Sequence, residues 1–220
     1  MMPTVAITGA GSGLGRALAL EYAKNNYHVY LLGRTDNKLH MVMHEIYQQK
    51  GSAEIVICDV AEPASVSLAF QQIGTLDVLI NNAGIGAFGP IAQYSLEDIE
   101  RMLNTNVKGT ILAVQSALEL IRKTHGRILN IISTAGLRGK IHESIYCASK
   151  FAVRGFTESL RKELQDESVR VTAVYMGGMN TPFWDKHTHV DKPENLKGAE
   201  SVAAQIFNED DGRETIYIDR

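Results

Sequence analysis

The chain has 220 residues, of which 45% are hydrophobic, enough for one substantial core, and we expect a single domain over residues 1–220. The formal net charge of −3 offers no electrostatic attraction for nucleic acid or for an anionic membrane, so the expected partner is a small molecule. Cys58 and Cys147 are too few for a disulfide framework. The start lacks a signal sequence and no apolar run approaches roughly 18 residues, so we expect a cytoplasmic protein that does not enter a membrane.

Short apolar segments rich in β-branched residues alternate along the chain with longer segments of helical period. The expected strands are residues 4–8, 28–32, 53–57, 77–80, 126–132, 169–175 and 214–218. Most of them are apolar throughout, which is typical of strands covered on both faces. The alternation predicts an α/β fold, a single Rossmann-type doubly wound parallel sheet of about seven strands with helices on both faces.

The first expected strand leads into the glycine-rich sequence TGAGSGLG, and a helix is expected to start near Leu14. Glycine allows a close approach of the backbone to a ligand, and the first N–H groups of a helix attract phosphate. The spacing differs from G-x-G-x-x-G and is T-G-x-x-x-G-x-G, formed by Thr8, Gly9, Gly13 and Gly15. We therefore predict that the phosphates of a dinucleotide bind at this turn.

The end of the second expected strand predicts which nicotinamide cofactor binds. Gly33 occupies the position where a carboxylate would bind the ribose 2′-hydroxyl of NAD(H), and Arg34 follows with a guanidinium suited to a 2′-phosphate. This pattern predicts that NADP(H) is preferred over NAD(H). Two alternatives remain open: Asp36 is close enough to be an acidic partner, and Arg34 could be only a solvated charge at a strand end.

A tyrosine and a lysine are four residues apart in SIYCASKFAV, a segment with helical period. Tyr146 and Lys150 therefore project from the same helical face, where the ammonium is expected to lower the tyrosine pKa from its usual value of about 10. The pair is a candidate acid/base unit. Cys147 points about 100° away around the helix and is expected to be a small packing residue.

Residues 181–198 are polar and contain two prolines, and we interpret them as a surface insertion or substrate lid. Phe183 and Trp184 open this segment and are expected to line the substrate mouth. His187 and His189 have no further ligand at a recognised metal spacing, so no metal site is predicted.

Together these segments resemble the short-chain dehydrogenase/reductase family, in its NADP-preferring branch, over roughly residues 4–181. The resemblance rests on TGAGSGLG, CDV, NNAG, NVKG, IISTAG and YCASK, which occur in this order. It implies hydride transfer between NADP(H) and a small carbonyl or alcohol substrate. The catalytic residues that it implies are Asn106, Ser133, Tyr146 and Lys150. The predicted cofactor-binding residues are Thr8, Gly9, Ser12, Gly13, Leu14, Gly15, Arg34, Asp59, Val60, Asn82, Ala83, Gly84, Tyr146, Lys150, Gly177 and Thr181.

The resemblance also implies a role for each catalytic residue. Tyr146 would donate a proton to the carbonyl oxygen, Ser133 would hydrogen-bond the same oxygen, and Lys150 would lower the tyrosine pKa and hold the ribose hydroxyls. Asn106 would support a water that links Lys150 to solvent. The alternative for Asn106 is a core residue that hydrogen-bonds only a neighbouring backbone.

The chain departs from the family pattern after the sixth expected strand. Met176 stands where the family usually has proline, although Gly177 and Thr181 remain, so we expect a looser loop and weaker cofactor binding. The chain is also short after Thr181, and we expect a small lid and a brief tail. A homodimer formed through the helices around residues 98–121 and 147–165 is therefore expected, with a homotetramer as the alternative.

Other functions and substrates remain open from the sequence. A regulatory or sensor protein that binds NADP(H) with little catalysis is the main alternative, and a nucleotide-sugar epimerase is disfavoured by the glycine spacing. Arg138, Lys140 and His142 lie near the expected mouth and could favour an anionic substrate, or could be a solvated rim.

Overall fold

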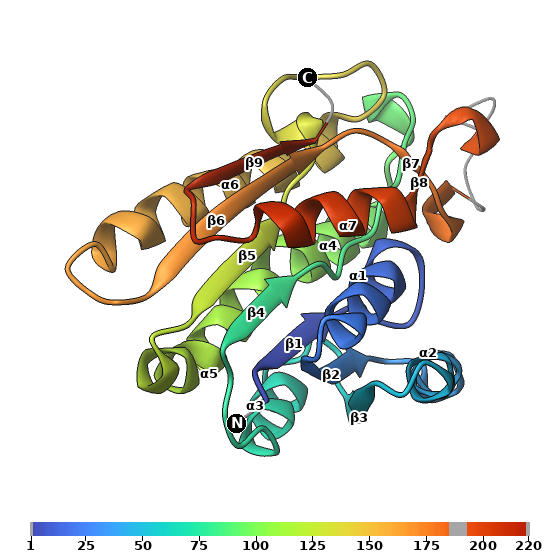
Figure 1. Cartoon of the computed structure of the whole chain (residues 1–220). Coiled ribbons are helices and arrows are strands. Elements are labelled where there is room, and N and C mark those ends of the chain that lie inside the picture. Colours follow the sequence, from blue (N-terminus) through green and yellow to red (C-terminus); the bar gives the residue numbers. More distant parts are fainter. Residues whose placement is uncertain (1, 185–192, 219–220) are drawn as a thin grey trace.

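The computed structural model describes residues 2–184 and 193–218, and its centre is a sheet of seven parallel strands (Figure 1). The strands are β1 (Thr4–Thr8), β2 (His28–Gly33), β3 (Ser52–Ile57), β4 (Val78–Asn81), β5 (Arg127–Ile131), β6 (Arg170–Met176) and β9 (Thr215–Ile218). They lie in the order β3-β2-β1-β4-β5-β6-β9. The predicted α/β class and its seven parallel strands are thus confirmed.

Helices cover both faces of the sheet and produce two cores. One core contains side chains of α1 (Gly13–Lys24), α2 (Asp36–Gln48) and α7 (Ala199–Glu209). The other contains side chains of α3 (Pro63–Gln71), α5 (Gly109–Thr124) and α6 (Ser144–Glu163). Successive strand residues alternate between the cores: Ile7 belongs to the first and Ala6 to the second. The inner strands, such as β1 and β4, are buried on both faces and largely apolar, whereas the edge strands β3 and β9 expose Glu54 and Tyr217.

The remaining elements are short and lie mostly around the carboxyl ends of the strands. They are η1 (Ile91–Gln93), α4 (Leu96–Leu103), the π-helical turn η2 (Asn104–Lys108), η3 (Thr134–Gly136), η4 (Pro182–Trp184), η5 (Pro193–Asn195) and the paired strands β7 (Met179–Asn180) and β8 (Lys197–Gly198). Within the described part of the chain, no helix has the length and apolar character that crossing a membrane requires.

The C-terminal part contains more structure than the brief tail that we expected. Helix α7 packs along α1, as Figure 1 shows, and its Val202, Ala203 and Ile206 are buried in the first core. The predicted lid over residues 181–198 contains η4, η5 and β8, and β8 pairs with β7 just before the lid, but the central residues, 185–192, lie outside the described residues. His187 and His189 belong to that part.

The sheet order places the expected site residues together. Strand order runs in opposite directions on either side of the β1–β4 pair, and ligands of open α/β sheets bind at such a switch point, beyond the carboxyl ends of the strands. The glycine turn follows β1, the NNAG sequence ends β4, Ser133 follows β5, and Met176 ends β6.

Candidate active site

A cleft of about 630 Å³ lies at the carboxyl ends of the strands. All predicted site residues line it except Thr8, Gly15 and Asn106, which lie behind its wall. The topology therefore brings together residues as far apart in the sequence as Gly9 and Thr181.

The glycine turn forms the floor of one half of the cleft. Gly9 and Gly13 have φ values of 68° and 53°, a region that side chains disfavour. A Cβ on Gly15 would lie 2.1 Å from the Gly9 carbonyl oxygen, so this helix residue must be glycine for the turn to close. A Cβ on Gly13 would lie 3.4 Å from the Thr181 Cβ, which places the loop after β6 directly against the turn.

Thr8 holds the turn in place from behind. Its hydroxyl accepts hydrogen bonds of 3.0 Å from the backbone N–H groups of Asn82 and Ala83. The Asn82 side chain in turn donates to the Thr8 carbonyl oxygen at 3.0 Å. These bonds join the ends of β1 and β4, so Thr8 shapes the cleft although only 2% of it is exposed.

Two basic side chains line the end of the cleft beyond β2. Arg34 lies there with its Nη1 atom 3.5 Å from the Asp59 carboxylate, and Lys38 lines the same wall. Asp36 points elsewhere, since its carboxylate pairs with His40 at 3.2 Å and is absent from the cleft wall. The sequence analysis did not identify Lys38. A basic residue in the first turn of the helix after Arg34 could have indicated a second cation at this end of the cleft.

The Tyr146–Lys150 pair lies on α6 at the other end of the cleft. The Lys150 Nζ atom donates a 3.1 Å hydrogen bond to the Ile131 carbonyl oxygen at the end of β5 and lies 5.7 Å from the centre of the Tyr146 ring. Lys150 is only 6% exposed, and its burial lowers its pKa to about 8 because the ammonium loses water.

The pKa of Tyr146 is raised, opposite to the direction that we expected from its neighbour Lys150. The main cause is burial, which disfavours the phenolate. A hydrogen bond with the Ser133 side chain lowers the pKa, and the negative charges of Glu143 and Cys147 raise it further. The sequence could show that an ammonium was near, but not that desolvation would outweigh it.

Ser133 stands between β5 and η3 in a strained backbone conformation. Its φ is 142°, which is rare for any residue except glycine. Its Oγ atom accepts a hydrogen bond from the Ala135 N–H at 3.2 Å, which leaves the hydroxyl proton for another acceptor. The hydrogen bond to Tyr146 joins Ser133 to the candidate Tyr146–Lys150 pair.

Asn106 lies in the π-helical turn between α4 and α5 rather than in a regular helix. Its side chain accepts from the Ile85 N–H and donates to the Ile85 carbonyl oxygen, both at 2.9 Å, and also donates to Ser149 at 3.0 Å. The side chain therefore bonds a neighbouring backbone, as in the alternative that we left open, and it holds the loop after β4 beside α6.

Aromatic rings surround the part of the cleft next to Tyr146. Phe88 lies 5.5 Å from the Tyr146 ring and stacks on Trp184 at 5.4 Å, and Phe183 lies 6.0 Å from Tyr146. Phe183 and Trp184 line the cleft, which agrees with the mouth predicted for them. Sequence reasoning missed Phe88, which is isolated in a glycine-rich loop without periodicity.

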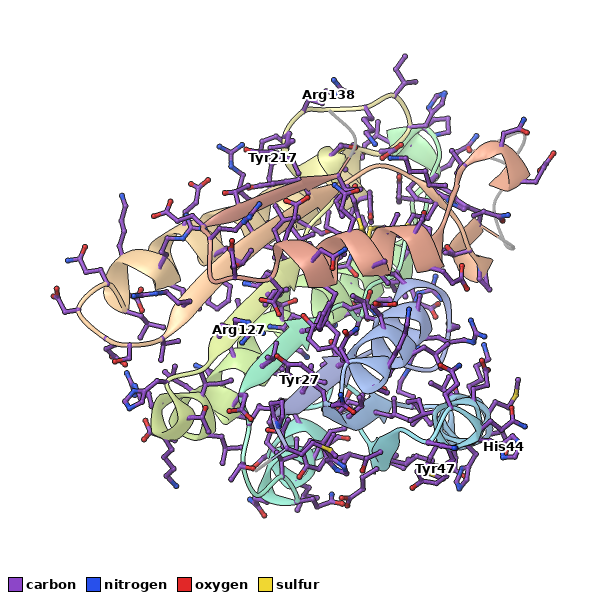
Figure 2. The ribbon with its side chains drawn as sticks, viewed as in Figure 1. Tyr27, His44, Tyr47, Arg127, Arg138 and Tyr217 are labelled. Carbon is purple, nitrogen blue, oxygen red and sulfur yellow. The ribbon has the colours of Figure 1, made fainter. Side chains whose placement is uncertain are left out.

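Of the three basic residues that we expected near the mouth, only Lys140 lines the cleft. Its Nζ atom lies 3.9 Å from the carboxylate of Glu143, a buried acid that lines the same wall and that sequence reasoning did not identify. Arg138 lies on the outer loop and points away from the body of the molecule (Figure 2). Two of the three basic residues that could favour an anionic substrate therefore lie outside the cleft wall, and the third lies beside a buried carboxylate. Across the described residues, no group of three or more potential metal ligands occurs.

Comparison with known proteins agrees with this arrangement. A family model described as short chain dehydrogenase matches residues 3–192. The sepiapterin reductase of Chlorobaculum tepidum is 36% identical, with 82% of this chain and 79% of the relative covered.

Two solved structures show the same fold with cofactor bound. A putative NAD(P)-dependent gluconate 5-dehydrogenase from Beutenbergia cavernae with bound NADP is 30% identical, with a TM-score of 0.88 over 99% of this chain and 95% of that one. A short-chain dehydrogenase/reductase from Burkholderia phymatum in complex with NAD is 25% identical, with a TM-score of 0.89 over 98% and 88%. With its cleft, its Tyr–Lys pair and these similarities, the chain belongs to the short-chain dehydrogenase family of oxidoreductases.

Proposed function

We propose that this protein is an NADP(H)-dependent reductase of small carbonyl compounds. The proposal rests on the observation that two different groups of side chains line the two ends of one cleft. Tyr146, Ser133 and Lys150 gather at one end, and Arg34 and Lys38 line the other. Between them lies the glycine turn, whose backbone can approach a pyrophosphate.

Each catalytic side chain has a function in carbonyl reduction. The bound nicotinamide supplies the hydride to the carbonyl carbon. Negative charge then develops on the carbonyl oxygen, and Tyr146 donates its proton there while the Ser133 hydroxyl stabilises the same oxygen. Lys150 supports the pair electrostatically and holds ribose hydroxyls with the ammonium protons that Ile131 does not accept. The raised pKa of Tyr146 suits a group that must carry its proton until the hydride arrives.

The preference for NADP(H) is supported by the two basic residues beyond β2. A 2′-phosphate beside Arg34 and Lys38 would form charge-assisted hydrogen bonds, and Asp36, which would favour a free ribose hydroxyl, is paired with His40 outside the cleft wall. One similar structure holds NADP and another holds NAD, so the family alone does not decide the cofactor.

A titration with both cofactors tests the proposal. Purified protein is titrated with NADPH and NADH by fluorescence, and aldehydes, ketones and diketones are then added. We expect tighter binding of NADPH and substrate-dependent loss of its fluorescence. In Tyr146→Phe, turnover should fall by roughly 10²- to 10⁴-fold with NADPH affinity almost unchanged. Unchanged turnover in this variant would refute the assignment of Tyr146.

A cofactor sensor with little catalysis is the second candidate, favoured by Met176. This residue lines the cleft where relatives of the predicted family have a rigid proline, so the loop after β6 is less constrained. NADPH binding without turnover of any carbonyl compound would support the sensor. Rapid NADPH oxidation would exclude it.

We also propose a homodimer that forms on the α4–α5–α6 surface. An apolar groove of about 370 Å³ lies there, lined by Leu103, Asn104, Val107, Lys108, Ile111, Leu112 and Ala152. Phe151, which is 42% exposed, stands next to this groove in sequence. Light scattering should show a dimer that Ala152→Arg converts to a monomer, since a guanidinium in the groove would be buried without a partner. A monomeric wild-type protein would exclude the dimer.

A further inference from the structure

The hydroxyl of Tyr94 fastens together two loops that border one end of the cleft. Tyr94 follows η1, and its Oη atom lies 2.9 Å from the Ala87 carbonyl oxygen in the loop after β4 and 3.2 Å from the His142 carbonyl oxygen in the loop before α6. A phenol has one proton, so the two carbonyl oxygens share it as acceptors. Gly89 adds a second connection, because its N–H donates a 2.8 Å hydrogen bond to the same His142 oxygen.

Both loops need such connections, because their backbones adopt uncommon conformations. His142 has a φ of 62°, which residues with a side chain seldom adopt, and Gly89 has a φ of 155°, which is accessible mainly to glycine. No residue of η1 is buried, so few apolar contacts hold this part of the chain. The hydrogen bonds to the His142 carbonyl oxygen are therefore important for the order of both loops.

The residue between the two connections is Phe88, whose ring packs against the candidate catalytic tyrosine. Phe88 follows Ala87 and precedes Gly89, so its backbone is fixed on both sides. Its ring lies edge-on to the Tyr146 ring, with 5.5 Å between the centroids and 71° between the planes. A Cβ on Gly86 would lie only 2.5 Å from the Phe88 Cζ atom, so the ring rests directly on the backbone there. Phe88 therefore touches Tyr146, although it does not itself line the cleft.

The position of the Tyr146 hydroxyl decides whether its proton can reach a carbonyl oxygen. Proton donation requires the two oxygens to approach to about 2.6 to 3.2 Å, and a displacement of about 1 Å can lower the rate roughly 100-fold. Rings from two loops pack around Tyr146, namely Phe88 at 5.5 Å and Phe183 at 6.0 Å. Phe88 also stacks on Trp184 at 5.4 Å and so joins the aromatic groups of both loops. A shift of Phe88 would leave space in which the Tyr146 ring could move.

We propose that Phe88 is a positioning residue for Tyr146, and that the hydroxyl of Tyr94 holds Phe88 in place by joining the two loops. Tyr94 fixes the loop, the loop fixes the Phe88 ring, and that ring limits the movement of the Tyr146 ring. The proposal rests on the proposed function, because it takes Tyr146 as the group that donates a proton to the substrate. Neither Tyr94 nor Phe88 has to touch the substrate or the cofactor.

Removal of one hydroxyl and removal of one ring test the two steps. NADPH oxidation by 2,3-butanedione and by propanal is followed in single turnovers, so that product release does not mask the chemical step. In Tyr94→Phe, we expect the rate to fall about fivefold, as for the loss of one hydrogen bond. In Phe88→Leu, we expect it to fall about 30-fold, because the Tyr146 ring loses its support. The Kd for NADPH should change by less than about twofold in both variants, since neither side chain lines the cleft.

A double variant shows whether Tyr94 acts through Phe88. If it does, adding Tyr94→Phe to Phe88→Leu should cause no further loss of rate. Tyr47→Phe is the matched control, because it removes a hydroxyl that donates a 2.8 Å hydrogen bond to the Ala53 carbonyl oxygen outside the cleft wall. This control should leave the rate unchanged.

The outcomes separate this proposal from the proposed function. An unchanged rate in Phe88→Leu would refute the positioning of Tyr146, and losses that multiply in the double variant would show that Tyr94 acts independently of Phe88. If Tyr94→Phe loses rate, NADPH affinity and unfolding free energy together, its hydroxyl only stabilises the fold. If the wild-type protein binds NADPH and reduces neither these compounds nor larger aldehydes, ketones and diketones, the proposed function itself fails, and the positioning role fails with it.

Discussion

Burial determines the chemistry of individual residues in this site. Lys150 and Tyr146 share one face of α6, and both have their uncharged forms favoured: the lysine pKa falls to about 8, and the tyrosine pKa rises. The pair therefore holds the tyrosine proton that a reductase must donate. The energetic cost of this arrangement falls on Lys150, because its buried ammonium loses water and donates a hydrogen bond to the Ile131 carbonyl oxygen in its place.

The pH dependence of stability should reveal the buried ammonium. The pKa of Lys150 is about 8 in the folded protein and near its ordinary 10.5 in the unfolded chain. Between these two values the unfolded chain binds more protons, so the free energy of unfolding should rise with pH over this window and not below it. The rise should be on the order of 3 kcal/mol. Urea unfolding from pH 7.5 to 10 should show it in the wild type and not in Lys150→Met. Parallel curves would mean that the ammonium is not desolvated.

Cofactor preference should depend on two side chains at the other end of the cleft. Replacing Arg34 or Lys38 with alanine removes a cation that we assign to the 2′-phosphate, so the Kd for NADPH should rise about tenfold for each. The Kd for NADH should hardly change, since NADH lacks this phosphate. Lys123→Ala, which removes an exposed lysine at the end of α5, is the matched control. Equal weakening of both cofactors would show that these residues only shape the pocket.

At the scale of a single element, the π-helical turn η2 interrupts the regular helix geometry between α4 and α5 next to the candidate site. The wider turn places Asn106 inside the packed region, where its side chain forms two bonds with the Ile85 backbone and one with Ser149. Such turns are often found at functional sites. The loop after β4 is thereby tied to α6, the helix that carries Tyr146 and Lys150.

Removing this connection should affect stability and catalysis together. Asn106→Ala leaves the partly buried N–H and C=O groups of Ile85 and the Ser149 hydroxyl without this partner, which should lower the free energy of unfolding by about 2 to 4 kcal/mol. The kcat should also fall, because the loop borders the catalytic pair. Asn208→Ala, on the exposed side of α7, is the control and should change little. If Asn106→Ala loses kcat at unchanged stability, the predicted water relay to Lys150 becomes the better explanation.

At the scale of the whole molecule, a buried network fastens the C-terminal part to the sheet. Arg127 on β5 donates from Nη2 to the Asp210 carboxylate at 2.8 Å and to the Tyr27 hydroxyl at 3.2 Å (Figure 2). Tyr22 of α1 donates to the same carboxylate at 2.5 Å, and only 1% of the Asp210 side chain is exposed. Asp210 immediately follows α7, so one carboxylate joins three distant parts of the chain.

Breaking this network should destabilise the entire fold. Asp210→Ala leaves the Arg127 guanidinium half-buried without its counter-ion, which should cost about 3 to 5 kcal/mol of unfolding free energy. Glu158→Ala breaks the exposed pair with Arg154 and should cost at most about 1 kcal/mol. Urea unfolding followed by tryptophan fluorescence and by circular dichroism measures both. Loss of α7 alone, seen as two separate transitions, would contradict a single cooperative unit.

Local patterns account for what the sequence predicted correctly. The inner strands are largely apolar because both of their faces are buried, and Gly9, Gly13 and Gly15 are needed for backbone reasons that operate within a few residues. Spacing in a helix likewise placed Tyr146 beside Lys150. These features depend on neighbours in the chain, so they can be recognised without a structure.

By itself, then, the sequence determined the fold class, through the periodicity of its segments. Through motifs that resemble a known family it also indicated that family and a set of site residues, of which all but Thr8, Gly15 and Asn106 line the cleft. The tertiary structure alone decided that Lys38 and Glu143 line the cleft, that Phe88 packs against Tyr146, that α7 completes one core, and that burial raises the pKa of Tyr146. The physical reason is that packing and desolvation depend on all the atoms around a group. Those atoms come from strands and helices that only the folded chain brings together.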